Sequence, residues 1–167
     1  MTTVTQALRE EHRELLPHIE RIREVADSVG RAPAQKVEHG IDEVHGFITH
    51  HLVPHAHAED RALYPVVGRV MGAPEATATM TFEHEQVVAL TEELESIRRR
   101  LGDGVAAQDW ELEARRVLYG LYTLVKVHFM EEEEVYLPIL DARLPAAEAR
   151  EMFEEMELAA AEVAGAT

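Results

Sequence analysis

Two stretches of the chain repeat one arrangement of histidine, glutamate and proline. HAHAEDRALYP (residues 55–65) and HFMEEEEVYLP (residues 128–138) both read H-x-x-x-E and place a proline ten residues after the histidine. On an α-helix, side chains four residues apart lie one turn apart on the same face. Imidazole and carboxylate groups are both metal ligands, so two such faces that meet would form a metal site. The residues concerned are His55, Glu59, His128 and Glu132.

Two further histidines fit the same repeat. His12 lies in line with apolar residues of its predicted helix and precedes His55 by 43 residues, and His84 precedes the second H-x-x-x-E by 44. Both follow a glutamate, as Glu11-His12 and Glu83-His84. A lone histidine on an apolar face is more often a core residue, but the repeat favours ligation. The predicted ligand set has pseudo-twofold symmetry and comprises His12, His55, Glu59, His84, His128 and Glu132.

The two glutamates of this set also favour a bound metal. A buried carboxylate is unfavourable unless it is paired or bound to a cation, and two that face each other repel. A pair of divalent or trivalent cations would remove both problems. Mixed nitrogen and oxygen ligands suit iron or manganese better than calcium, which prefers oxygen ligands alone.

Other residues near these motifs receive ordinary structural interpretations. His39 and Glu43 also form H-x-x-x-E, but no proline follows at the same spacing and Gly40 lies between them, so a solvated pair is predicted. We predict that the remaining acids of the second motif form a solvated face. We predict that the tyrosine in each motif packs in the core. A ferritin-like site is disfavoured because no glutamate stands three residues before a histidine. These acids and tyrosines are Glu131, Glu133, Glu134, Tyr64 and Tyr136.

Apolar residues that recur every three to four positions predict the helices that carry these side chains. Short loops between helices favour antiparallel neighbours, so the predicted fold is all-α, an up-down-up-down antiparallel four-helix bundle (about 3–140) with a short additional C-terminal helix, in a single domain (1–167). Pro54 and Pro65 would bend the second helix, and Pro138 and Pro145 would bracket the last connection. The predicted helices cover residues 3–29, 35–71, 75–101, 109–137 and 145–163.

Composition limits the classes of partner. The net charge of −16 disfavours nucleic acid and anionic membranes, which attract basic surfaces. The chain has no cysteine and no apolar run of about 20 residues, the length of a membrane span. Its start lacks the apolar core of a signal peptide, so a cytoplasmic location is expected. The C-terminal helix is expected either to dock on the bundle or to pair with another subunit or protein.

Four segments, EEHREL, HAHAEDRALYP, FEHEQV and HFMEEEEVYLP, resemble the hemerythrin-like, or HHE cation-binding, family. The resemblance implies a four-helix bundle that holds two iron ions with an oxo, hydroxo or water bridge, whereas manganese and zinc rank below iron. It further implies that Glu59 and Glu132 bridge the two irons. His12 and His55 would then ligate one iron, and the other two histidines of the set would ligate the second.

The chain departs from hemerythrins proper, which use five histidines and carry an H-x-x-x-H pair on the third helix. No histidine stands four residues before or after His84. Because His51 precedes His55 by four residues, we predict His51 as the fifth imidazole, which leaves the vacant position on the iron of His84 and His128. Glu132 also stands four residues after its histidine, where hemerythrins proper place an aspartate five after. Both departures argue against reversible oxygen carriage.

Three functions follow from these patterns. The first is a di-iron protein that binds or reduces O2, peroxide or NO; with no protein nucleophile or base evident, any enzymatic activity would be centred on the metal. The second is a non-catalytic module that stores or senses iron or oxygen through a protein partner at its C-terminal helix. The third is a metal-free interaction bundle, which the buried histidines and glutamates disfavour. Peroxide consumption separates the first two functions, and the stability of the metal-free protein tests the third.

Overall fold

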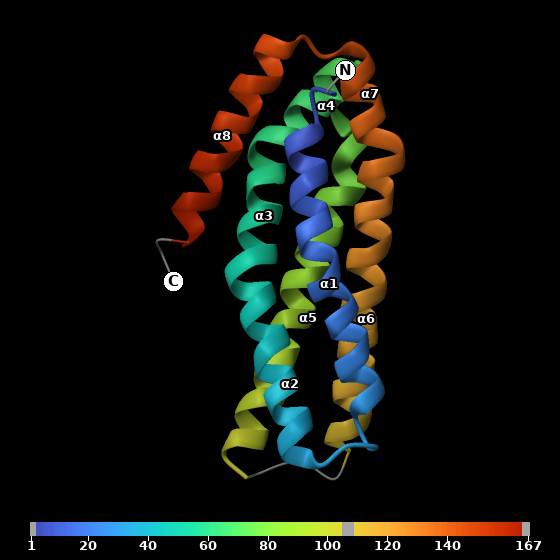
Figure 1. Cartoon of the computed structure of the whole chain (residues 1–167), viewed down its shortest axis with the longest axis vertical. Helices are drawn as coiled ribbons and strands as arrows, with labels where there is room; N and C mark the ends of the chain where they lie inside the picture. The colour runs from blue at the N-terminus through green and yellow to red at the C-terminus, as the bar shows by residue number, and fades with distance from the viewer. Residues whose placement is uncertain (1–2, 105–108, 165–167) are drawn as a thin grey trace.

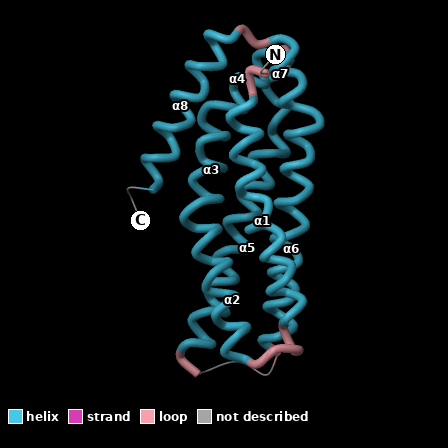
Figure 2. The backbone as a smooth tube through the Cα atoms, in the orientation of Figure 1, coloured by secondary structure: helices cyan, strands magenta, loops and turns pink. Residues whose placement is uncertain are grey.

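The computed structural model describes residues 3–104 and 109–164, which are helical with short connections and contain no strand (Figures 1 and 2). The all-α prediction is therefore confirmed for this part of the chain. No helix within it is long and apolar enough to cross a membrane. The elements in chain order are α1 (Gln6–Ser28), α2 (Ala34–Phe47), η1 (Ile48–Leu52), α3 (Val53–Ala58), η2 (Glu59–Leu63), α4 (Tyr64–Met71), η3 (Pro74–Thr77), α5 (Ala78–Gly102), α6 (Trp110–Glu131), η4 (Glu132–Tyr136), α7 (Leu137–Arg143) and α8 (Ala146–Ala164).

The long helices pack around a shared apolar interior. α1 contacts α2 and α6, and α5 contacts the same two elements, so the four close a ring around the core (Figure 1). The apolar stripes predicted from the three-to-four spacing face inward, and the side chains at the centre of this ring have almost no exposed surface. They include Ile19, Ile22, Ile41, Leu94, Leu118 and Leu121.

Three wide, π-helical turns interrupt the regular helices, and each ends two residues before a proline. In each turn a backbone N–H donates to the carbonyl five residues earlier instead of four. A proline has no N–H to donate, and its ring crowds the preceding turn of a regular helix. The extra residue of a wide turn shifts the hydrogen-bond register at that point, so the helix continues past the proline. The donor–acceptor pairs are Val53–Ile48, Tyr64–Glu59 and Leu137–Glu132, and the prolines are Pro54, Pro65 and Pro138.

This feature corrects one predicted boundary. The fourth helix was expected to end at residue 137, but the helical backbone continues through the wide turn of η4 and past Pro138 to Arg143. A proline near the start of a helical segment costs little, because the N–H it lacks would have had no partner there. Pro138 therefore lies inside a continuous helical segment and does not begin the connection to the last helix.

α8 packs along α3 and the wide turn η2 (Figure 1). Met152 and Met156 of this helix join a buried cluster with Leu8 of α1, Ala58 of α3 and Leu63 of η2. The C-terminal helix thus docks on the rest of the chain, one of the two outcomes expected from the sequence. That it also serves as an interface with a partner stays a prediction.

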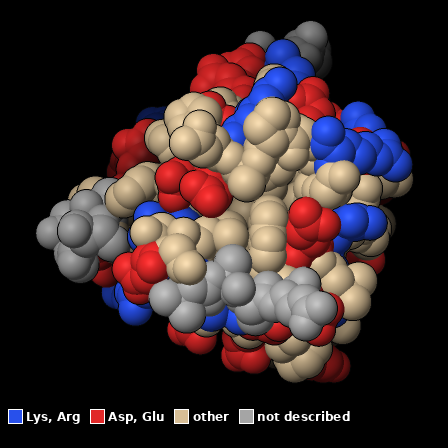
Figure 3. Space-filling view, turned by 90° about the horizontal axis from the view of Figure 1, so that it is seen from below, with Lys and Arg blue, Asp and Glu red and all other residues tan. Residues whose placement is uncertain are grey.

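Charged side chains of both signs are interspersed on the end of the molecule shown in Figure 3. Ion pairs join neighbouring helices, such as Arg100 of α5 with Glu113 of α6 and Arg98 of α5 with Asp42 of α2. Exposed pairs of this kind stabilise a protein by at most about 1 kcal/mol each. These pairs neutralise individual acids, but the net charge of −16 remains.

Two glycines of α2 test how closely the first two helices pack. A Cβ on Gly40 would lie 2.9 Å from Val25 Cγ2, and Val25 is buried and stiff, whereas a Cβ on Gly46 would meet no atom within 4 Å. We expect Gly40→Ala to lower the free energy of unfolding by about 1–3 kcal/mol through overpacking. Gly46→Ala should instead raise it by about 0.5–1 kcal/mol through helix propensity. Urea denaturation of both variants measures this difference, and equal effects would contradict the close contact.

Candidate metal centre

The structure brings all six residues of the predicted symmetric set to one buried place. Each has at most 7% of its surface exposed, and Glu59 and Glu132 have none. Their donor atoms form two groups, in each of which the atoms lie within 4.8 Å of one another. Glu59 belongs to both groups and so joins them. One group contains His12, His55, Glu59 and Glu132, and the other contains Glu59, His84 and His128.

A regular α-helical turn in front of each wide turn explains why each H-x-x-x-E pair shares a face. Glu59 and Glu132 are the first residues of η2 and η4, so the four residues before each of them form a regular α-helical turn. His55 Nε2 consequently lies 3.0 Å from Glu59 Oε1, and His128 Nε2 lies 3.7 Å from Glu132 Oε1. His12 reaches the same place from α1 and His84 from α5. Four long helical segments therefore supply the donors.

A carboxylate accompanies the outer nitrogen of every imidazole in the set. Carboxylate oxygens only accept hydrogen bonds, so each Nδ1 carries the proton and donates it. In the neutral ring the Nε2 lone pair is then free, and all four lone pairs point to the centre. Such partners fix the orientation of metal-binding histidines and strengthen them as ligands. The pairs are His12–Glu133 (2.9 Å), His55–Glu11 (2.9 Å), His84–Asp60 (3.0 Å) and His128–Glu83 (2.8 Å).

These partners obey the same pseudo-twofold symmetry as the ligands. Glu11 and Glu83 each directly precede a histidine of the set, whereas Asp60 and Glu133 each directly follow a glutamate of the set. The repeated Glu-His dipeptide in the sequence was a signal for the first two. Glu133, which was predicted to be solvated, is half-buried and also pairs with Arg9. Its role depends on helix packing and has no local signature.

The centre contains buried polar atoms that have no hydrogen-bond partner and that a cation would satisfy. The buried Nε2 atoms of His12 and His55, both carboxylate oxygens of Glu59 and Oε2 of Glu132 have no hydrogen-bond partner. Such orphaned groups cost about 1–3 kcal/mol each and are rare in folded proteins. His84 Nε2 and His128 Nε2 face each other at 3.0 Å, although each is a lone pair in the neutral rings. The donor set therefore fits metal ions.

Without a metal, these groups hold protons instead. Burial and the neighbouring Glu59 raise the pKa of Glu132 to about 7. Burial opposes the charged form of His84, but Asp60 and Glu59 outweigh it and raise the pKa of His84 to about 9. Burial likewise opposes ionisation of Glu59, but its contacts with His55 and His12 keep its pKa well below the usual range. Near pH 7 the carboxylate of Glu59 is thus ionised and the carboxyl group of Glu132 is about half protonated.

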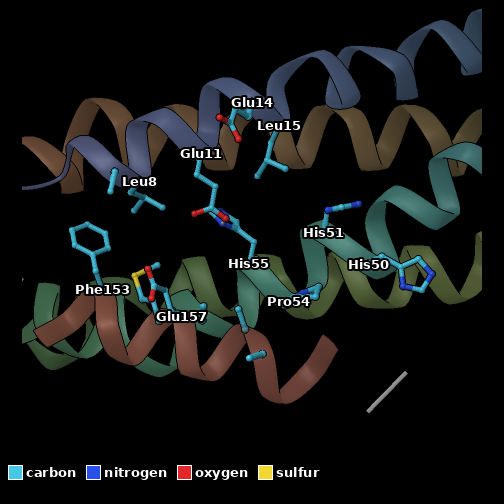
Figure 4. A pocket seen from close by; sticks show the side chains of 15 residues that line it. Leu8, Glu11, Glu14, Leu15, His50, His51, Pro54, His55, Phe153 and Glu157 are labelled. Carbon is cyan, nitrogen blue, oxygen red and sulfur yellow. The ribbon is translucent and has the colours of Figure 1, made fainter. Parts of the chain in front are cut away.

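His51 is not brought to the centre, so the structure does not support it as the fifth imidazole. It is exposed and belongs to neither group of donors. A wide turn ends between His51 and His55, so side chains four residues apart no longer share a face there. His51 instead lines an open pocket of about 490 Å³ between α1, α3 and α8. Figure 4 shows Glu11 directed at the ring of His55, whereas His51 does not point toward it.

Tyr64 is the residue of the centre that the sequence analysis assigned to core packing. Its hydroxyl group donates a hydrogen bond of 2.8 Å to Glu132 Oε1 and lies 3.1 Å from His128 Nε2. Tyr136, by contrast, donates to the backbone carbonyl of Ala76. The two residues before the proline are Leu-Tyr in the first motif and Tyr-Leu in the second. This reversed order was the sequence signal that distinguished the two tyrosines.

A small apolar cavity adjoins the two donor groups. Its volume is about 20 Å³, which is room for roughly one water-sized molecule. Phe129 forms part of its wall and stacks on the ring of His12 with 4.4 Å between ring centroids. The size of this cavity suits a ligand of one or two heavy atoms. The wall also includes Leu52, Ala56, Val87 and Val125.

Removal of one supporting carboxylate should weaken metal binding without removing a donor. We expect Glu83→Gln to lower the metal affinity about 10- to 100-fold, because His128 loses the acceptor that fixes its proton on Nδ1. Glu85→Gln on the same helix is the matched control, since Glu85 is exposed. Competition with a chelator measures both affinities. Equal affinities of the two variants would show that this contact does not orient His128.

The comparisons with known proteins agree with this geometry. The family model for the hemerythrin HHE cation-binding domain matches residues 3–140, which include every member of the symmetric set. No curated protein and no solved structure gives a significant match. The matched region covers most of the sequence and ends before α8. The chain belongs to the hemerythrin HHE cation-binding domain family.

Proposed function

We propose that this protein holds two iron ions at the buried centre and binds O2, peroxide or NO there. The observation that carries the proposal is the convergence of four imidazole lone pairs and two carboxylates with no other partner for several of these atoms. Mixed nitrogen and oxygen donors favour iron over calcium, with manganese and zinc as weaker alternatives. The size of the adjoining cavity supports a very small ligand.

Different residues would hold the metal ions, orient the histidines and exclude water at such a site. Glu59 faces both groups of donors, and Glu132 completes the group of His12 and His55. The supporting carboxylates keep the Nδ1 protons in place, and Phe129 with its apolar neighbours keeps bulk water out. Bound iron would supply the electrons and the Lewis acidity for oxygen, peroxide or NO chemistry. None of the surrounding side chains is placed as a nucleophile.

The packing also supports a finer description of the fold. The ring formed by α1, α2, α5 and α6, with short connections, supports an up-down-up-down antiparallel four-helix bundle. In this description η1 to α4 extend the second helix, and η4 and α7 extend the fourth. α8 is then an addition outside the region matched by the family.

Metal analysis and ligand assays test the proposal. The purified or reconstituted protein should contain two irons per chain, show near-ultraviolet absorption from an oxo or hydroxo bridge, and bind NO or consume peroxide. Two irons with no response to O2, peroxide or NO would favour the non-catalytic module that stores or senses iron. A folded protein that takes up no transition metal, and is as stable as before on addition of iron, would leave only a metal-free interaction role.

A further inference from the structure

We propose that Tyr64 is a direct protein ligand of the metal ion held by His84 and His128. This inference rests on the proposed function, since it needs a metal pair. It assigns different sets of donors to two ions whose histidine and glutamate ligands are related by symmetry.

The first observation is the position of the Tyr64 hydroxyl group among the donors. Tyr64 Oη lies 2.8 Å from Glu132 Oε1, 3.1 Å from His128 Nε2 and 3.5 Å from His84 Nε2. The residue is 3% exposed, so its hydroxyl group is buried among these donors. Tyr64 Oη therefore lies nearly as close to His128 Nε2 as the two imidazole nitrogens lie to each other, at 3.0 Å.

The second observation is that these separations match those of donors around one ion. Adjacent donors of an octahedral cation with bonds of about 2.1 Å lie about 3 Å apart, and opposite donors lie about 4 Å apart. Glu59 Oε2 is 3.4 Å from His84 Nε2 and 4.0 Å from His128 Nε2. Glu132 Oε1 is 3.7 Å from His128 Nε2. Tyr64 therefore adds a fourth protein donor beside Glu59, His84 and His128.

The third observation is that the corresponding position of the other group carries no donor. Tyr64 stands five residues after Glu59, and the residue five after Glu132 is Leu137, which is fully buried. The tyrosine of the second motif, Tyr136, lies one position earlier and donates to the carbonyl of Ala76. The order of tyrosine and leucine is reversed between the two motifs. The reversal places a phenol on one side of the centre and an aliphatic side chain on the other.

With Tyr64, the two groups of donors become equal in number. The group of His12 and His55 offers four protein atoms, namely the two Nε2 atoms, Glu59 Oε1 and Glu132 Oε2. The group of His84 and His128 offers three protein atoms without the phenol and four with it. Tyr64 thus supplies to this group the donor that Glu132 supplies to the other.

Ligation requires the phenol to lose its proton. The O–H bond breaks as the oxygen–metal bond forms, and the proton is released to solvent, as happens when a thiol coordinates a cation. The resulting phenolate adds one negative charge and a hard oxygen donor, which suits ferric iron. No oxidant or reductant is needed for this exchange.

Visible spectroscopy of the iron-loaded protein tests the inference. Wild type loaded with ferric iron should show a phenolate-to-iron charge-transfer band, with tyrosinate ring modes in its resonance Raman spectrum. Tyr64→Phe should lose both signals, whereas Tyr136→Phe should keep them. The variant Tyr119→Phe/Tyr122→Phe/Tyr136→Phe leaves Tyr64 as the sole tyrosine and should also keep both signals, so the test stands even if Tyr64→Phe fails to fold.

The outcomes separate this inference from the proposed function. Wild type with two bound irons and no phenolate signal would overturn ligation by Tyr64 and leave the di-iron proposal intact. Persistence of the band in Tyr64→Phe, or its loss in the variant that keeps only Tyr64, would also overturn it. Failure of the wild type to bind iron at all would reject both.

Discussion

Glu59→Gln is expected to abolish binding of both metal ions. Glu59 is the residue whose carboxylate belongs to both groups of donors, and both of its oxygens lack a hydrogen-bond partner. An amide is a much weaker ligand than a carboxylate, and its NH2 group would point a donor at one metal position. Loss of a residue shared by both positions should therefore remove both ions together. Iron analysis after reconstitution should fall from two irons per chain to close to zero.

Glu43→Gln is the matched control for this variant. Glu43 also stands four residues after a histidine, His39, but both side chains are exposed and their contact is 3.2 Å at the surface. The sequence analysis predicted a solvated pair here, and the structure confirms it. Glu43→Gln should keep two irons. One retained iron in Glu59→Gln would show that the two positions fill independently and that Glu59 does not join them.

The second large effect concerns the pH dependence of the metal-free protein. Glu132 has a folded-state pKa of about 7 and an ordinary value of 4.5, so the folded protein binds its proton more tightly than the unfolded chain does. His84 has a folded-state pKa of about 9 against 6.5, so the stability it contributes is present below about pH 6.5 and lost as the pH rises through 9. Both groups therefore lower the free energy of unfolding as the pH rises.

The expected loss between about pH 5 and pH 9 is about 2–4 kcal/mol, because a shift of one pKa unit corresponds to about 1.4 kcal/mol and neighbouring groups share protons. Glu59 does not offset it, since its lowered pKa places its own titration below this interval. Iron should reverse the trend, because metal ions bind the deprotonated groups. Urea denaturation of metal-free and iron-loaded protein across this interval measures both slopes.

Glu132→Gln isolates one contribution to this slope. The variant lacks the carboxyl group with the raised pKa, so its metal-free form should lose less stability between about pH 5 and pH 7 than the wild type. Glu134→Gln, which changes an exposed neighbour, should behave as the wild type. A metal-free wild type that becomes more stable from about pH 5 to pH 9 would contradict the protonation scheme.

The sequence by itself determined the helical class and the six symmetric candidate ligands. Both depend on spacing along the chain: four residues span about one turn of an α-helix, so His55 with Glu59 and His128 with Glu132 needed no knowledge of the partner helices. The repeat then pointed to His12 and His84 and to a bound cation, because two buried glutamates that face each other are unfavourable without a cation between them.

Only the tertiary structure decided the roles of His51, Tyr64 and the supporting carboxylates. His51 stands four residues before His55, so a regular α-helix would place both on one face. The wide turn before Pro54 changes this register and leaves His51 exposed. Tyr64 lies five residues after Glu59, beyond a second wide turn, which carries its hydroxyl group to the donors of two other helices. The supporting acids act on histidines of different helices. Contacts between helices depend on turn register and packing, which periodicity within a single helix does not specify.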